Sequence, residues 1–278
     1  MKIKLFLIYA ILLTLCLTGN LFAGDQVQMN FIGFSEDGKY LAFEEIESSE
    51  EGWEFENDTT YILDTAKNSF AAAPVVFKWD EKQPAKLEST FRLRYKRKAA
   101  ATLKRFGIKR DNLGQLVVSH LLYDWSYVKP VEREQNFTQS DGTEIKKMMP
   151  DYQGAYVPKA GYTIEKVIFN PEPSDFVVNT SEFYELTLVV APDDCRACDA
   201  GYKIELTLKD NMRHKERPLQ ILQKDTDKLP ASRRDAFAYK IERVFVYSNK
   251  IAVFLNVFGP GFEGTHIGNM VVTGEFEW

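Results

Sequence analysis

The hydrophobic pattern at the start of the chain predicts short antiparallel strands. Apolar residues cluster at positions 31–34 and 40–43, and the dipeptide Asp37-Gly38 between them favours a tight hairpin turn. A third apolar segment, residues 59–64, predicts another strand. The stretch between the second and third segments is strongly acidic, and the pattern predicts that it forms a loop.

The apolar spacing becomes helical between Pro84 and Gly107. Apolar residues recur there every three or four positions, so they fall on one face of a helix and leave basic residues on the other. Glycine commonly follows a helix end, so we expect the helix to stop at Gly107. The predicted apolar stripe consists of Leu87, Phe91, Tyr95, Ala99, Leu103 and Phe106.

Strand patterns return after residue 114. Polar residues, proline and glycine dominate residues 129–159, which predicts a long loop, and residues 232–239 predict a short helix. The predicted strands are residues 116–122, 162–169, 183–190, 202–208, 240–247, 251–258 and 270–276. We therefore predict a strand-dominated α+β fold, with an antiparallel sheet or two packed sheets beside one long basic amphipathic helix.

The N-terminus has the order of features that is typical of a secretory signal peptide. Two lysines precede an almost unbroken apolar run at residues 5–17, and Ala23 offers a small residue for cleavage. The run is shorter than the roughly 20 residues that a membrane-spanning helix needs, and no later segment is long and apolar enough. We expect residues 1–23 to be removed and residues 24–278 to form a single domain.

Cys16 leaves a second form of export open. A cysteine behind an apolar run is a feature of bacterial lipoproteins, which are acylated at that residue. Leu15 is bulky for the position directly before such a cysteine, and this disfavours lipidation. We therefore expect a secreted or periplasmic protein rather than a lipoprotein.

The charge of the chain is mildly acidic and unevenly distributed. The formal net charge is −5 and becomes −7 when the two signal lysines are lost, so we expect no nucleic-acid partner. Eight acids and no base occupy residues 44–58, whereas ten bases and one acid occupy residues 86–110. The acidic stretch lacks the Asp/Asn spacing and central glycine of a calcium loop, and we predict no metal and no cofactor.

The basic stretch has two interpretations. It could bind an anionic partner, such as a lipid, a polysaccharide or an acidic protein of the envelope. The interpretation that the pattern favours is the solvated face of a helix that lies near the acidic loop. The candidate surface for an anionic partner consists of Arg92, Arg94, Lys96, Arg97, Lys98 and Arg105.

Cys195 and Cys198 are the two cysteines left after signal removal. An isolated pair in an oxidising compartment favours a disulfide. Strand patterns flank the pair, so we predict a structural disulfide that closes a turn. Catalytic redox cysteines usually lie at the start of a helix, which the pattern here does not predict. The alternatives to a structural disulfide are a redox-active pair and half of a metal site.

Sequence signatures of common enzymes are absent. The chain has no Gly-x-Ser-x-Gly, no His-Glu-x-x-His and no phosphate-binding or dinucleotide-binding glycine motif. Ser126 and Lys129 have the Ser-x-x-Lys spacing of penicillin-recognising enzymes, but the pattern around them is not helical and the accompanying motifs are missing. We predict no catalytic residues, although an exported hydrolase could assemble a carboxylate pair through its fold.

A glycine-rich segment after a strong apolar strand, residues 259–266, is the candidate ligand loop. Glycines let a backbone approach a ligand closely, and the loop also carries an aromatic, an acid and a histidine. The alternative is an ordinary hairpin connection whose glycines supply positive φ angles. The candidate ligand contacts are Phe262, Glu263 and His266.

Three motifs together carry a family resemblance. They are the opening FIGFSEDGKYLAFEE at residues 31–45, YILD at 61–64 and the closing VFGPGFEG at 257–264. With the signal peptide, they resemble an uncharacterised family of predicted secreted bacterial proteins, a domain of unknown function. The resemblance implies an envelope or secreted location and supplies no activity.

Taken together, these features favour an exported, non-enzymatic binding or accessory module of the bacterial envelope. The basic helix face or the glycine-rich loop would contact its partner. The alternatives are an exported hydrolase with carboxylates brought together by the fold and a thiol–disulfide redox protein that uses Cys195 and Cys198.

Overall fold

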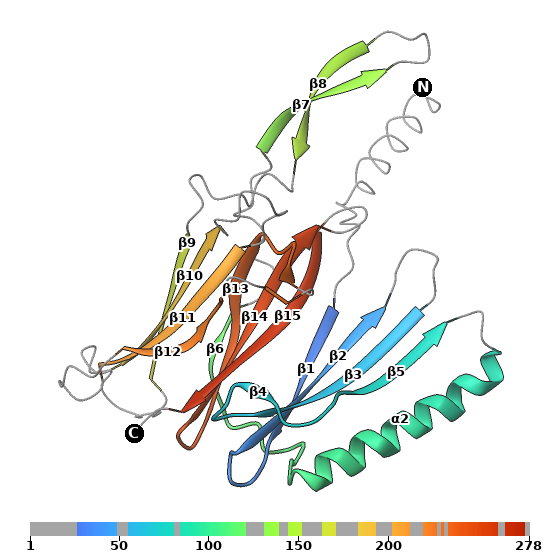
Figure 1. Cartoon of the computed structure of the whole chain (residues 1–278), viewed down its shortest axis with the longest axis vertical. Coiled ribbons are helices and arrows are strands. Elements are labelled where there is room, and N and C mark those ends of the chain that lie inside the picture. The colour runs from blue at the N-terminus through green and yellow to red at the C-terminus, as the bar shows by residue number, and fades with distance from the viewer. Residues whose placement is uncertain are drawn as a thin grey trace, which may run out of the picture.

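The fold is antiparallel and dominated by strands. A computed structural model describes residues 27–48, 55–80, 84–120, 131–138, 144–151, 163–170, 183–192, 202–211, 219–226, 229–230, 233–260 and 265–275. Within these residues there is one α-helix, α2 (Ala85–Arg105), and all strand pairs are antiparallel (Figure 1). The predicted strand-dominated α+β class is confirmed. No helix in this part of the chain has the length and apolar character needed to cross a membrane.

The N-terminal strands form the first sheet. In it β2 lies between β1 and β3, and both β4 and β5 pair with β3. The strands predicted at 31–34, 40–43 and 59–64 are confirmed. The strand bounds are β1 (Val27–Phe34), β2 (Tyr40–Ser48), β3 (Phe55–Asp64), β4 (Ser69–Phe70) and β5 (Val75–Asp80).

The acidic stretch is strand at both of its ends, so the predicted loop was wrong there. The end of β2 pairs with the start of β3 inside this stretch. Inner apolar pairs such as Phe43 opposite Tyr61 fix the register, and the ladder then continues outward through the acids. Alternation along β2 places Glu44 on the face that meets α2 and Glu45 on the opposite face.

The central sheet has the order β15-β14-β13-β6. Its strand β14 is buried on both faces: Val253 and Leu255 contribute to one apolar core, and Ala252 and Phe254 to another. This two-sided burial explains the unbroken apolar run at 251–258. The strand bounds are β6 (Gln115–Ser119), β13 (Ala238–Tyr247), β14 (Lys250–Pro260) and β15 (Thr265–Glu275).

A third sheet covers the other face of the central one, so that three sheets are stacked (Figure 1). Burial alternates strictly along β10, and Leu186, Leu188 and Leu206 are buried against the central sheet. The prediction of one or two sheets did not contain this third layer. The strand bounds are β9 (Thr163–Phe169), β10 (Tyr184–Pro192), β11 (Tyr202–Asp210) and β12 (Gln220–Lys224).

Helix α2 packs on the outer face of the first sheet. Tyr95 and Ala99 are buried against β5, and Leu103 is buried against β2 and β3. Leu87 and Phe91, which the predicted stripe also contained, are 39% and 37% exposed. The helix ends as predicted, before Gly107 at a φ of 64°.

Two other local predictions were wrong. Residues 129–159, predicted as a loop, contain the hairpin β7 (Val131–Thr138) and β8 (Glu144–Asp151), whose polar sequence hides the alternation that usually reveals a strand. Residues 232–239, predicted as a short helix, make a single turn after Arg233 before β13 begins. Pairing of β13 with β14 outweighs the local helical pattern there.

Candidate functional site

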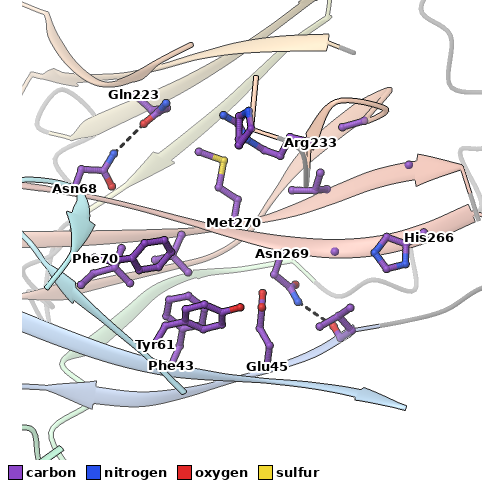
Figure 2. A pocket seen from close by; sticks show the side chains of 18 of the residues that line it. Phe43, Glu45, Tyr61, Asn68, Phe70, Gln223, Arg233, His266, Asn269 and Met270 are labelled. Carbon is purple, nitrogen blue, oxygen red and sulfur yellow. Dashed lines mark hydrogen bonds between the residues drawn. The ribbon is translucent and has the colours of Figure 1, made fainter. Parts of the chain in front are cut away.

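A cleft of about 680 Å³ lies along β15, where the three sheets approach one another (Figure 2). Its volume is within the range of roughly 300–1,000 Å³ that is usual for small-molecule sites. Side chains enter it from the first sheet, from β15 and from the third layer. The lining includes Phe43, Glu45, Tyr61, Phe70, Gln223, Arg233, His266, Asn269 and Met270.

An aromatic wall, made of Phe43, Tyr61 and Phe70, forms the first-sheet side of the cleft. The rings of Phe43 and Tyr61 stack at a centroid distance of 4.9 Å, and those of Tyr61 and Phe70 at 5.5 Å. Antiparallel pairing produces this row because Phe43 and Tyr61 lie directly opposite each other on β2 and β3. The wall offers a flat apolar surface on which a ligand group could stack.

Glu45 lies two residues beyond Phe43 on β2, so both side chains are on the cleft side of the sheet. Burial raises the pKa of Glu45 to about 7, a hydrogen bond with Tyr61 opposes this rise, and the charge of Glu47 adds to it. Burial and the Glu45 charge in turn raise the pKa of Tyr61 to about 12. Glu45 is therefore divided between its neutral and charged forms near neutral pH, and can donate or accept a hydrogen bond.

The opposite wall contains Met270 and Arg233. Figure 2 shows the Met270 side chain directed toward Arg233. The guanidinium of Arg233 donates two hydrogen bonds to the buried carboxylate of Asp225, at 2.8 and 2.7 Å. This bidentate pair compensates the Arg233 charge and fixes its side chain, which is 10% exposed. The wall is consequently rigid and close to neutral.

Asn68 joins the three sheets at one end of the cleft. It lies in the turn between β3 and β4 with a φ of 49°, a conformation that asparagine tolerates better than most residues. Its Nδ2 donates to Gln223 Oε1 on β12 at 2.9 Å, and its Oδ1 accepts the backbone N–H of Thr273 on β15 at 2.9 Å. The cleft wall is thus held by one side chain that reaches both other layers.

Two described residues of the candidate ligand loop, residues 259–266, lie at this cleft. β14 continues to Pro260 and β15 starts at Thr265, so the connection between the strands is shorter than predicted. His266 and Gly259 line the cleft. Phe262 and Glu263 lie outside the described residues, as do Cys195 and Cys198, so the disulfide and its alternatives stay predictions.

The candidate anionic-partner surface lies on α2, away from the cleft. Arg94, Lys96, Arg97, Lys98 and Arg105 are exposed. Arg92 differs, because it is only partly exposed. Its guanidinium lies 3.0 Å from Glu88 and 3.5 Å from Asp58, and is 4.7 Å from the centroid of the Phe77 ring. Arg92 therefore packs against the first sheet.

Sequence reasoning missed Glu45, Tyr61, Arg233 and Met270 as cleft residues. Glu45 had a detectable signal, because it follows Phe43 at the two-residue spacing that places both on one face of a strand. Arg233 and Met270 had none, since their positions depend on how distant segments pack. Within the described residues, no three His, Cys, Asp or Glu side chains gather in a way that could hold a metal ion.

The geometry defines a class: a layered antiparallel β-protein with a helix on one outer face and an apolar cleft that contains a titratable carboxyl. The sequence matches the family model described as "Predicted secreted protein (DUF2259)" over residues 42–275. The chain therefore belongs to this family of predicted secreted proteins, whose function is unknown, and the resemblance seen in the sequence is confirmed. No curated protein and no solved structure matched the chain.

Proposed function

We propose that this protein is an exported, non-enzymatic binding protein of the bacterial envelope and that the cleft along β15 holds its ligand. The observation that carries the proposal is the combination of an aromatic wall, a rigid opposite wall and a partly buried carboxyl with a raised pKa in one cleft. Sites for organic ligands usually have this composition: mostly apolar walls with a few fixed polar groups. Membership of a predicted secreted family supports the exported location.

The ligand chemistry follows from the walls. A flat or branched apolar group would stack on Tyr61 and Phe70, since apolar surface removed from water contributes roughly 25 cal/mol per Å². Glu45 and Asn269 would supply hydrogen bonds that orient the polar part of the ligand. Because Arg233 is already paired with Asp225, the cleft does not select for a strongly anionic ligand.

A cleft-filling variant tests the proposal. The probe is N-phenyl-1-naphthylamine, an uncharged dye whose fluorescence rises in apolar sites, titrated into the mature protein. Met270→Trp should fill the cleft and weaken dye binding at least tenfold. The matched control is Ile168→Trp on β9, where the native side chain is 60% exposed and remote from the cleft lining. Equal dye affinity in the Met270→Trp variant and the wild type would overturn the cleft as the ligand site.

An exported hydrolase is the alternative that one observation favours. Glu45 has a pKa of about 7, which suits a general acid, and Asp235 supplies a second carboxyl to the cleft lining. This alternative predicts that the protein hydrolyses chromogenic glycosides and that Glu45→Gln abolishes turnover while dye binding persists. A binding protein releases no product in the same assay.

The basic face of α2 is a second candidate surface. Arg94, Lys96, Arg97 and Lys98 have no ion-pair partner within the part of the chain that the structure describes, and Leu93 beside them is 49% exposed. Such a face favours contact with an anionic envelope surface. Sedimentation with phosphatidylglycerol vesicles tests it.

Lys96→Glu with Arg97→Glu should remove most vesicle binding. The charge-matched control, Lys166→Glu with Lys209→Glu on the third sheet, should retain it. Equal binding by the two double variants would exclude the helix as the contact surface.

A further inference from the structure

Among the residues that the structure describes, no strand pairs with the backbone groups along the edge of β15 that lines the cleft. β15 pairs with β14 on one side, and no other strand pairs with it among the described residues. Thr273 donates its backbone N–H to Asn68, so this N–H points away from β14. In a strand, the N–H and C=O groups of one residue point to the same side, and those of the next residue point to the opposite side. Asn269 and Val271 therefore point theirs outward too, in the same direction as Thr273.

These outward groups are bordered by apolar surface on both faces of the central sheet. Val271 contributes to the core between the central and first sheets, whereas Met270 packs against the core between the central and third sheets. A strand laid beside β15 would alternate in the same way. Its side chains on one face would meet Tyr61 and the rest of the aromatic wall, and those on the other face would meet Met270 and Arg233.

The geometry points to an extended polypeptide as the ligand of this cleft, added to the edge of β15 as a further strand of the central sheet. This inference rests on the proposed function and specifies its ligand class. A row of outward N–H and C=O groups matches the backbone of an extended chain, which presents the same row in return. The ligand is a segment of another exported polypeptide with apolar side chains at alternate positions.

The structure also limits the length and the face pattern of the ligand. Asn68 occupies the edge at Thr273, so strand addition covers the part of β15 from Ile267 to Val271. A ligand of about five residues spans this part at roughly 3.4 Å per residue. The apolar side chains of the ligand would lie on the face toward the first sheet, where they would stack against the aromatic wall. Its other side chains would lie on the face toward the third sheet.

Short synthetic peptides test the inference directly. The probes are fluorescent hexapeptides of the pattern Thr-X-Thr-X-Thr-X, in which X is Val, Leu or Phe, and binding is measured by polarisation with the mature protein. Each probe is compared with two versions that are N-methylated at odd or at even positions. Methylation removes the N–H groups along one edge of the peptide, so one version should lose at least tenfold in affinity and the other should lose little.

Amide hydrogen exchange supplies a second readout. A bound peptide should slow exchange at Asn269 and Val271, whose N–H groups point outward, and should leave Thr273 unchanged because Asn68 already accepts its N–H. Met270→Trp should abolish peptide binding, and Ile168→Trp should not.

The outcomes separate this inference from the proposed function. If the dye binds in the cleft but none of the three peptides does, or if both methylated versions bind as well as the parent, strand addition is refuted and the proposed function stands. If neither dye nor peptide binds, the proposed function itself fails. Edge-dependent peptide binding, with protection at Asn269 and Val271, supports both.

Discussion

Replacing Glu45 with glutamine should change how the stability of this protein depends on pH. Burial raises the pKa of Glu45 from 4.5 to about 7 in the folded protein. Between these two values the folded state binds the proton more tightly than the unfolded state. The free energy of unfolding therefore falls as pH rises through this window. The difference corresponds to about 3 kcal/mol, which is present below about pH 4.5 and lost above about pH 7.

Urea unfolding at several pH values from about 5 to 8.5 measures this effect, provided that the m-value stays constant. Glu45→Gln keeps the size of the side chain and removes the titration. The variant should resemble the wild type near pH 5 and exceed its stability by about 2–3 kcal/mol near pH 8. Burial also raises the pKa of Glu165, but that residue is present in both proteins, so its contribution cancels in the difference.

A parallel decline of the wild type and Glu45→Gln with pH would refute the reasoning, because it would show that Glu45 titrates alike in the folded and unfolded states. Tyr61→Phe provides a second check. It removes the hydrogen bond that opposes the pKa rise of Glu45, so the fall in stability should extend to higher pH.

Four further substitutions, at three positions, test local contacts of the fold. Asn68→Gly should lower the free energy of unfolding by about 2–3 kcal/mol, since it leaves the N–H of Thr273 without its partner. Asn68→Ala should lower it by about 1 kcal/mol more, because alanine is strained at the positive φ of this position. The midpoints of urea unfolding measure both effects. Gly33→Ala should cost about 2–4 kcal/mol by the same assay, because its Cβ would lie 2.4 Å from a backbone oxygen at a φ of 142°. Tyr95→Phe should cost about 1–2 kcal/mol by thermal unfolding, since its hydroxyl bonds Glu44 at 2.5 Å.

The class of fold could be predicted because its strongest signals are local. The apolar run at 251–258 is typical of a strand covered on both faces, and the helical stripe around Tyr95 and Ala99 gave the position of α2. The hairpin of β7 and β8 could not be predicted, since its polar residues lack the alternation of a half-buried strand. The third sheet could not be predicted, because the apolar sequence of a buried strand does not show how many sheets stack in the fold.

The position of the cleft could not be predicted, because no single segment of the sequence forms it. Its walls come from residue 27 and from segments 43–70, 223–236, 257–259 and 266–271, which are brought together only when three sheets stack. His266 could be chosen as a candidate because the glycines near it marked an unusual connection. Glu45 could have been found from its spacing to Phe43, but the excess of acids around it suggested a solvated loop instead.

The two-sided burial of β14 has a consequence for how the chain reaches this fold. Phe43 packs against Phe254, which is synthesised roughly 200 residues later. The first sheet therefore cannot cover its apolar face while the chain is still being synthesised. Folding must await the last strands, and until then the exposed strands need protection from aggregation. Late, cooperative assembly of the stacked sheets suits this arrangement.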